Sequence, residues 1–145
     1  FIRLGGRGKS YPTNPEEAEK LPKREPGILR NIWIHDLQAV VTGDQKNRCG
    51  PVMITGIPGH NVEQVLLENV SISYPGGGTE EDACVVVPED EDRYPEQYFF
   101  GVLPAWGAYL RHARKIAFRN VVFRTRTQDM RKEIVLDDVD DFIRE

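Results

Sequence analysis

Apolar and polar residues alternate in three segments of this chain, and the three segments share one pattern. They are residues 29–39, 62–72 and 113–123. Apolar residues occupy the same four places in each, and one Asx residue separates the first two from the last two: Asp36, Asn69 and Asn120. Alternation with a period of two indicates a strand with one buried face. Because the Asx residue shifts the phase of the alternation, we expect the chain to bend there.

Shorter apolar segments precede these repeats, at residues 1–4, 52–55 and 108–111. Residues 134–137 begin a fourth unit, which residues 139–143 continue. The repeating unit is a strand, a turn, a strand, an Asx corner and a further strand, which describes a three-sided coil. The Asx positions recur after 33 and then 51 residues, so the loops between strands differ in length. The pattern predicts an all-β solenoid of about four stacked coils.

Two long insertions interrupt the predicted coils, at about residues 5–27 and 75–105, within a chain of one-domain length. The first is basic and rich in proline, and an Asn followed by Pro predicts a short helix over residues 14–20. The second contains an acidic run at residues 89–92 and several aromatic residues. A loop of this length is usually functional or packs over an open face.

The chain begins directly on a predicted strand, which would leave the edge of the first coil bare. We therefore expect these 145 residues to be the C-terminal part of one longer parallel β-helix domain, or to pair with its missing N-terminal coils.

Several unusual stretches occur in the order found in a known family of proteins. They are residues 51–65, 67–70, 74–78, 94–96, 101–107, 109–112 and 134–138. Together they resemble bacterial members of glycoside hydrolase family 28, the polygalacturonase-like enzymes of pectin degradation, over nearly the whole chain. The resemblance implies a right-handed, single-stranded parallel β-helix of the pectin-lyase type. It also implies hydrolysis of galacturonic-acid-containing pectin with inversion, in which one carboxylic acid protonates the leaving oxygen and a carboxylate activates water.

The catalytic motifs of that family do not carry over to this chain. Asn-Thr-Asp is absent, and Asp137-Asp138 lies after every repeat with no Gly-His-Gly following it. Gly59-His60-Asn61 lacks the final Gly, and Phe1-Ile2-Arg3 is not Arg-Ile-Lys. We therefore assign no catalytic residue and expect the chain alone to be inactive, even if a longer parent is a glycosidase. The alternative is a non-catalytic β-helix module that binds carbohydrate or is purely structural.

Three residues are candidates for substrate binding: Arg3, Tyr109 and Arg111. They alternate with inward apolar neighbours and would point outward on the strand side that carries the substrate groove in the family. The planar guanidinium of Arg can donate two parallel hydrogen bonds to a uronate carboxylate. Ordinary surface salt bridges or loop anchoring would explain the same residues.

Other polar and aromatic residues leave two interpretations open. His60 and His112 could act as acid–base groups or be structural. The aromatic residues could stack on sugar rings or hold the long loop onto the strands: Tyr98, Phe99, Phe100 and Trp106. The acidic run at residues 137–141 lacks the spacing and glycine of an EF-hand, so we predict no metal site and no cofactor.

Composition narrows the class of partner. The net charge of −4 gives no basic face for nucleic acid, and no apolar stretch approaches the length of a membrane-spanning helix. Cys49 and Cys84 lack metal-site spacing, and the sequence does not decide whether they pair. We expect a pectin-type polysaccharide or oligogalacturonide as partner. A polymeric substrate of this kind implies a secreted or periplasmic protein.

Overall fold

The computed structural model describes residues 2–6, 25–43, 50–93 and 96–145. The described strands are β1 (Ile2–Arg3), β2 (Arg30–Val40), β3 (Val52–Thr55), β4 (Val62–Tyr74), β5 (Ala105–Thr125) and β6 (Lys132–Arg144). A short helix, α2 (Glu80–Ala83), and a 3-10 helix, η1 (Gln97–Phe100), lie between β4 and β5. The predicted helix at residues 14–20 and Cys49 lie outside the described residues, whereas Cys84 is an exposed free thiol.

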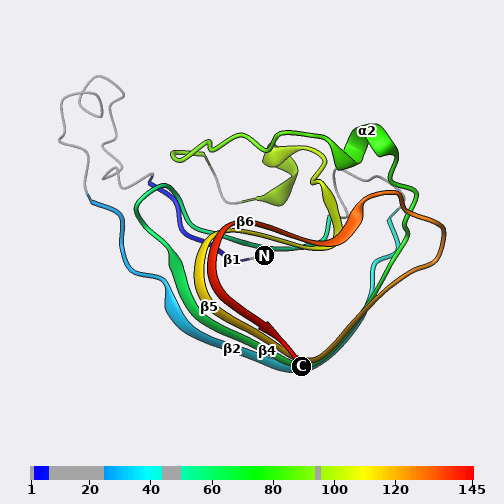
Figure 1. Ribbon diagram of the computed structural model, residues 1–145, viewed down its shortest axis with the longest axis horizontal. Helices are drawn as coiled ribbons and strands as arrows, with labels where there is room; N and C mark the ends of the chain where they lie inside the picture. Colours follow the sequence, from blue (N-terminus) through cyan, green and yellow to red (C-terminus); the bar gives the residue numbers. More distant parts are fainter. Residues whose placement is uncertain (1, 7–24, 44–49, 94–95) are drawn as a thin grey trace, which may run out of the picture.

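The strands form one curled sheet in which each of the five strand pairs is parallel. The order along the sheet is β1-β3-β5-β4-β2, and β6 pairs with β5. Figure 1 shows the strands curving side by side around a common interior, open on the side where loops connect them. The prediction of a mostly β fold with parallel strands is confirmed.

The register of the sheet matches the sequence repeats. Ile32 lies beside Val65, and Val65 lies beside Ile116, so equivalent positions stack on one another. The Asx residues stack in the same way and form a ladder of side-chain hydrogen bonds on the surface. Asn69 donates to Asp36 over 3.1 Å, and Asn120 donates to Asn69 over 2.9 Å. The predicted Asx corners are therefore confirmed, and each adopts positive φ.

The sheet bends at two further columns, and one of them lies at the turn predicted between residues 108–111 and 113–123. One column of residues with positive φ contains Asn31, Gln64, Lys115 and Asp141. Another contains His112 and Asp138, which occupy neighbouring places in β5 and β6. Left-handed backbone is costly for residues other than glycine, and Asx tolerates it best. Gln64 and Lys115 are not typical turn residues, so their identity gave no signal of a bend, whereas the bend at His112 confirms the turn predicted before the third repeat.

The main apolar core fills the inner face of the curl. Ile54, Leu110 and Phe118 are fully buried there, and the Phe118 ring makes edge contacts with Phe123 and Phe142. Complete burial of such a side chain contributes about 1.5–3 kcal/mol. The edge strand β2 is more exposed, with Trp33 at 60%. The core is therefore best packed around β4 and β5.

A second apolar cluster lies on the outer face, beneath the long insertion that carries α2 and η1. It contains Met53, Val87, Phe100, Leu103 and Tyr109, each less than 9% exposed, together with Ala105. Figure 1 shows this insertion passing over the side of the sheet formed by β3 and the first parts of β5 and β6. The long loop thus packs over a strand face, one of the two roles predicted for it.

The turn between β5 and β6 is held to this insertion by a buried ion pair. Asp129 and Arg131 approach to 2.7 Å, and their side chains are 1% and 6% exposed. Arg131 also donates to the Leu103 carbonyl, and the Gly78 amide donates to Asp129. A Cβ at Gly78 would lie 2.3 Å from both members of the pair, so only glycine fits there.

Candidate functional site

The three candidate binding residues face a nine-residue segment of the insertion, residues 85–93, which we call the strap. Arg3 Nη1 donates to the Thr55 hydroxyl, and Nη2 donates to the carbonyls of Glu89 and Asp90 over 3.1 and 3.0 Å. The Arg3 guanidinium lies 4.4 Å from the centre of the Phe100 ring. Burial lowers the pKa of Arg3, and the charges of Glu89 and Asp90 oppose this shift. Arg3 therefore anchors the strap.

Arg111 contacts both the strap and β6. Its Nη1 donates to the Val87 carbonyl over 2.9 Å, and its Nη2 forms an ion pair with Glu89. Its Nε lies 3.1 Å from Asp137 Oδ2, but the buried Nε–H makes no hydrogen bond there. The side chain is only 18% exposed. Arg111 thus lies between two carboxylates of its own chain, and its buried Nε–H has no hydrogen-bond acceptor.

Tyr109 lies on the outer face, as the alternation predicts, but it is only 2% exposed because the insertion covers it. Its hydroxyl donates to Asp137 Oδ2 over 3.0 Å. Burial raises the pKa of Tyr109, while the nearby Arg111 charge lowers it less. The side chain of Tyr109 therefore points to the outer face of the strand, as predicted, but it is not exposed to solvent.

His112 completes the cluster at the bend between the two halves of β5. Its Nδ1 lies 2.6 Å from Asp138, and its Nε2 lies 3.2 Å from both carboxylate oxygens of Glu89. The backbone at His112 has a φ of 46°, which aims the ring at the strap rather than along the strand. His112, Arg111 and Arg3 are thus brought together around Glu89 and the strap backbone.

An open pocket of about 500 Å³ borders this cluster, within the size range of ligand pockets. Its polar lining includes Arg111, Tyr109, Asp137 and Lys132. Lys132 is exposed and has no ion-pair partner among the residues that the structure describes. The pocket therefore presents two cations: Arg111, which is already paired with Glu89, and Lys132, which is available to a ligand.

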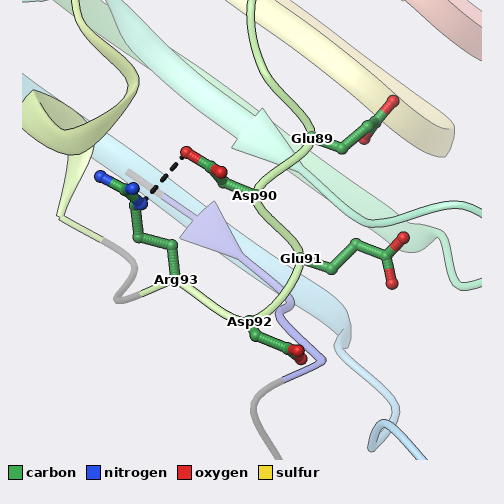
Figure 2. Close-up of a pocket in the computed structure, with 5 residues that line it drawn as sticks. All are labelled: Glu89, Asp90, Glu91, Asp92 and Arg93. Carbon is green, nitrogen blue, oxygen red and sulfur yellow. Dashed lines mark ion pairs between the residues drawn. The ribbon is translucent and has the colours of Figure 1, made fainter.

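The acidic residues of the strap point in different directions. Figure 2 shows Asp90 facing Arg93, whereas Glu89 and Glu91 project to the other side of the chain. Within the described ranges, no group of three or more His, Cys, Asp or Glu side chains is placed to hold a metal ion. Nor does any helix there have the length and apolar character needed to cross a membrane.

His60 lies elsewhere, in a pocket of about 250 Å³ that Gly6, Glu25 and Pro26 also line. Its Nε2 lies 3.8 Å from the exposed carboxylate of Glu25. The aromatic candidates divide as well. Phe100 packs under the insertion, Trp106 packs against the main core, and Tyr98 is 54% exposed. Packing accounts for Phe100 and Trp106 without any sugar.

The sequence did not indicate the residues that pair with the cations. Residues 89–92 and 137–141 stood out only as acidic runs, with no predicted partner. The register could have placed Asp137 and Asp138, because Arg111 and Asp137 occupy paired positions in β5 and β6. Nothing local could have placed Glu89, which lies 22 residues before Arg111 in an insertion without repeats.

Comparisons of this chain with protein-family models, with curated proteins and with solved structures give no match.

Proposed function

We propose that this chain is the C-terminal β-helix portion of a glycoside hydrolase of the family 28 type, acting on galacturonic-acid-containing pectin. The observation that carries the proposal is the stacking of strands in register, with bends at equivalent places in successive strands. A chain that returns to the same position after each turn of a solenoid produces this arrangement. The sequence resemblance described above supplies the enzyme class.

The cations on the outer strand face support a uronate ligand. Arg111 and Lys132 border the 500 Å³ pocket, and Arg3 lies in the adjoining cluster. A guanidinium binds a carboxylate through two parallel hydrogen bonds, and an ammonium adds a point charge. The pocket therefore has the chemistry to hold one uronate unit of a polysaccharide, whose size would place the protein outside the cytoplasm.

The edge formed by β1 and β2 supports a place for earlier coils. An apolar pocket of about 200 Å³ opens there, lined by residues that include Ile2, Ile34 and Leu37. No described strand pairs with the outer side of β1 or β2. A preceding coil of the same β-helix would cover this apolar surface and pair both edges.

Calorimetric titration with trigalacturonate tests the proposal. We expect Lys132→Gln to weaken binding about tenfold, since the ammonium is a charge partner of the uronate. Lys115→Gln is the matched control, because Lys115 is also exposed, lies away from the pocket and has Gln64 at its equivalent position. Equal affinities of both variants and the unmodified chain would contradict the assignment of the pocket.

The second candidate function is a non-catalytic β-helix module for carbohydrate, favoured by the lack of the family's catalytic motifs in these residues. Both functions predict that the purified chain releases no reducing ends from polygalacturonate. They differ for a longer protein that joins these residues to the preceding coils that the proposal requires. Reducing ends released by that longer protein would support the hydrolase, and binding without release would support the module.

A further inference from the structure

We propose that Arg111 and His112 form a carboxylate-binding site that the strap fills with its own Glu89, so that the strap competes with carboxylate ligands. Assigning a uronate to this site rests on the proposed function, whereas the carboxylate chemistry rests on contacts within the chain. Arg111 Nη2 pairs with Glu89 Oε1, and His112 Nε2 lies 3.2 Å from each carboxylate oxygen. Glu89 thus receives a guanidinium and an imidazole together.

The guanidinium and the imidazole are positioned by contacts other than those to Glu89. His112 is fixed by its 2.6 Å contact with Asp138 and by the bend in β5. Arg111 extends from β5 beside Asp137 of the neighbouring strand. An imidazole with a carboxylate at each nitrogen donates to both only when both nitrogens carry hydrogen. Two donors held in place in this way can still bind a ligand carboxylate after the Glu89 carboxylate has left them.

Burial differs between the partners in a way that favours exchange. The side chains of His112 and Arg111 are 10% and 18% exposed, whereas Glu89 is 36% exposed. The anion is therefore the outermost member of the cluster. An open pocket of about 590 Å³ is lined by Glu89 and the four residues after it, and one of about 500 Å³ is lined by Arg111. A ligand carboxylate can approach without rearrangement of the sheet.

Competition between Glu89 and a ligand carboxylate determines how much the removal of Glu89 should strengthen ligand binding. A tethered group has an effective concentration in the millimolar range, so a free carboxylate must compete with it. A Glu89→Gln variant keeps the size of the side chain and removes its charge. We expect this variant to bind D-galacturonate about tenfold more tightly than the unmodified chain, because the binding-competent state is more populated.

Glu91→Gln is the matched control. Glu91 lies on the same strap and loses the same charge, but its side chain projects away from Asp90 and has no contact with Arg111 or His112 among the described residues. Its backbone carbonyl, which accepts from the Gly6 amide, is unchanged. We expect Glu91→Gln to bind D-galacturonate like the unmodified chain, and the double variant Glu89→Gln/Arg111→Gln to lose the gain.

Each variant is titrated with D-galacturonate, and binding is measured by calorimetry and by the NMR signals of the His112 ring. Neutral D-galactose serves as the comparison ligand. A gain confined to Glu89→Gln and to the charged ligand supports the proposal. Equal or weaker binding by folded Glu89→Gln overturns it and shows that Glu89 only anchors the strap. If that variant is unfolded, Glu89→Asp replaces it, because the shorter side chain reaches Arg111 less well. An intermediate gain then supports the proposal, and unchanged affinity overturns it.

The same titration separates this proposal from the proposed function. If Glu89→Gln binds propionate as tightly as D-galacturonate, the carboxylate site is supported and the uronide assignment fails. If the unmodified chain binds trigalacturonate and Glu89→Gln shows no gain for either ligand, the uronide assignment survives and internal competition is overturned.

Discussion

At the scale of single residues, Asp129 shows how a buried charge holds two loops together. Its carboxylate accepts hydrogen bonds from the Gly78 amide and from the amide and guanidinium of Arg131. Burial raises the pKa of Asp129, but the hydrogen bonds from Arg131 and Gly78 outweigh burial and bring the pKa below its usual value of 3.8. The folded protein therefore favours the charged form. The resulting stability is present above about pH 4 and is lost as the pH falls through the lowered pKa.

We expect Asp129→Asn to lower the free energy of unfolding by about 3 kcal/mol at neutral pH, since it leaves Arg131 buried without a counter-charge. The difference from the unmodified chain should shrink as the pH falls below about 4, where the carboxyl of the unmodified chain becomes protonated. Urea denaturation across this range measures both. Asp140→Asn is the control, because Asp140 is exposed and has no ion pair among the described residues. A difference that stays constant with pH would contradict the role of the charge.

At the scale of elements, the Asx ladder ties β2, β4 and β5 together at one bend. Asn69 lies in its centre, with one bond to Asp36, one to Asn120 and a φ of 53°. The His35 hydrogen bond, with a second from Asn69, lowers the pKa of Asp36, so the Asp36 end of the ladder stays charged. The ladder therefore combines backbone geometry with side-chain bonding.

Asn69→Ala should reduce the free energy of unfolding by about 2 kcal/mol, because it removes two hydrogen bonds and places Ala in left-handed backbone. Asn69→Gly should cost less, since glycine adopts that backbone without strain. Chemical denaturation of both variants checks this order, with exposed Gln38→Ala on β2 as the control. Finding the glycine variant less stable than the alanine variant would show that backbone strain is not the larger effect.

The elements also show which parts of the fold the sequence could predict. Alternation, the breaks between strands and the repeated Asx residues were sufficient to predict the strands, the Asx corners and the turn at His112, because strand periodicity and turn chemistry are local properties. The bends at Gln64 and Lys115 were missed, because stacking imposes their backbone rather than their own preference. Periodicity likewise predicted the outward strand positions of Arg3, Tyr109 and Arg111, whereas it could not place Glu89, because the insertion has no repeat.

At the scale of the whole molecule, the outer strands carry matching features on opposite edges. In the stacked register, Trp33 of β2 is equivalent to Ile143 of β6, and both are about half exposed. Arg30 of β2 is likewise equivalent to Asp140 of β6. A second copy placed with its β6 against β2 would bring apolar residues and opposite charges together.

We therefore expect the isolated 145-residue chain to associate as its concentration rises, head to tail through this edge. Trp33→Lys should shift the association to higher concentration by about tenfold, because a charged edge opposes strand pairing. Sedimentation velocity over a concentration series measures the shift. Val86→Lys is the control, since Val86 is an exposed apolar residue on the strap and not on the edge. If both variants shift the association equally, the association is non-specific and does not depend on the edge.

The regular register has a consequence for how reliably the chain reaches this fold. Because Ile32, Val65 and Ile116 are interchangeable in their surroundings, β2 could pair with β5 directly and keep every apolar residue facing inward. Such a skipped pairing would satisfy the hydrophobic pattern and still be a misfolded chain. What distinguishes the correct neighbour is the lengths of the connecting loops and the identity of each polar rung, such as the Asp36 carboxylate that accepts from Asn69. The polar residues at the bends, more than the apolar core, thus select the correct strand pairing during folding.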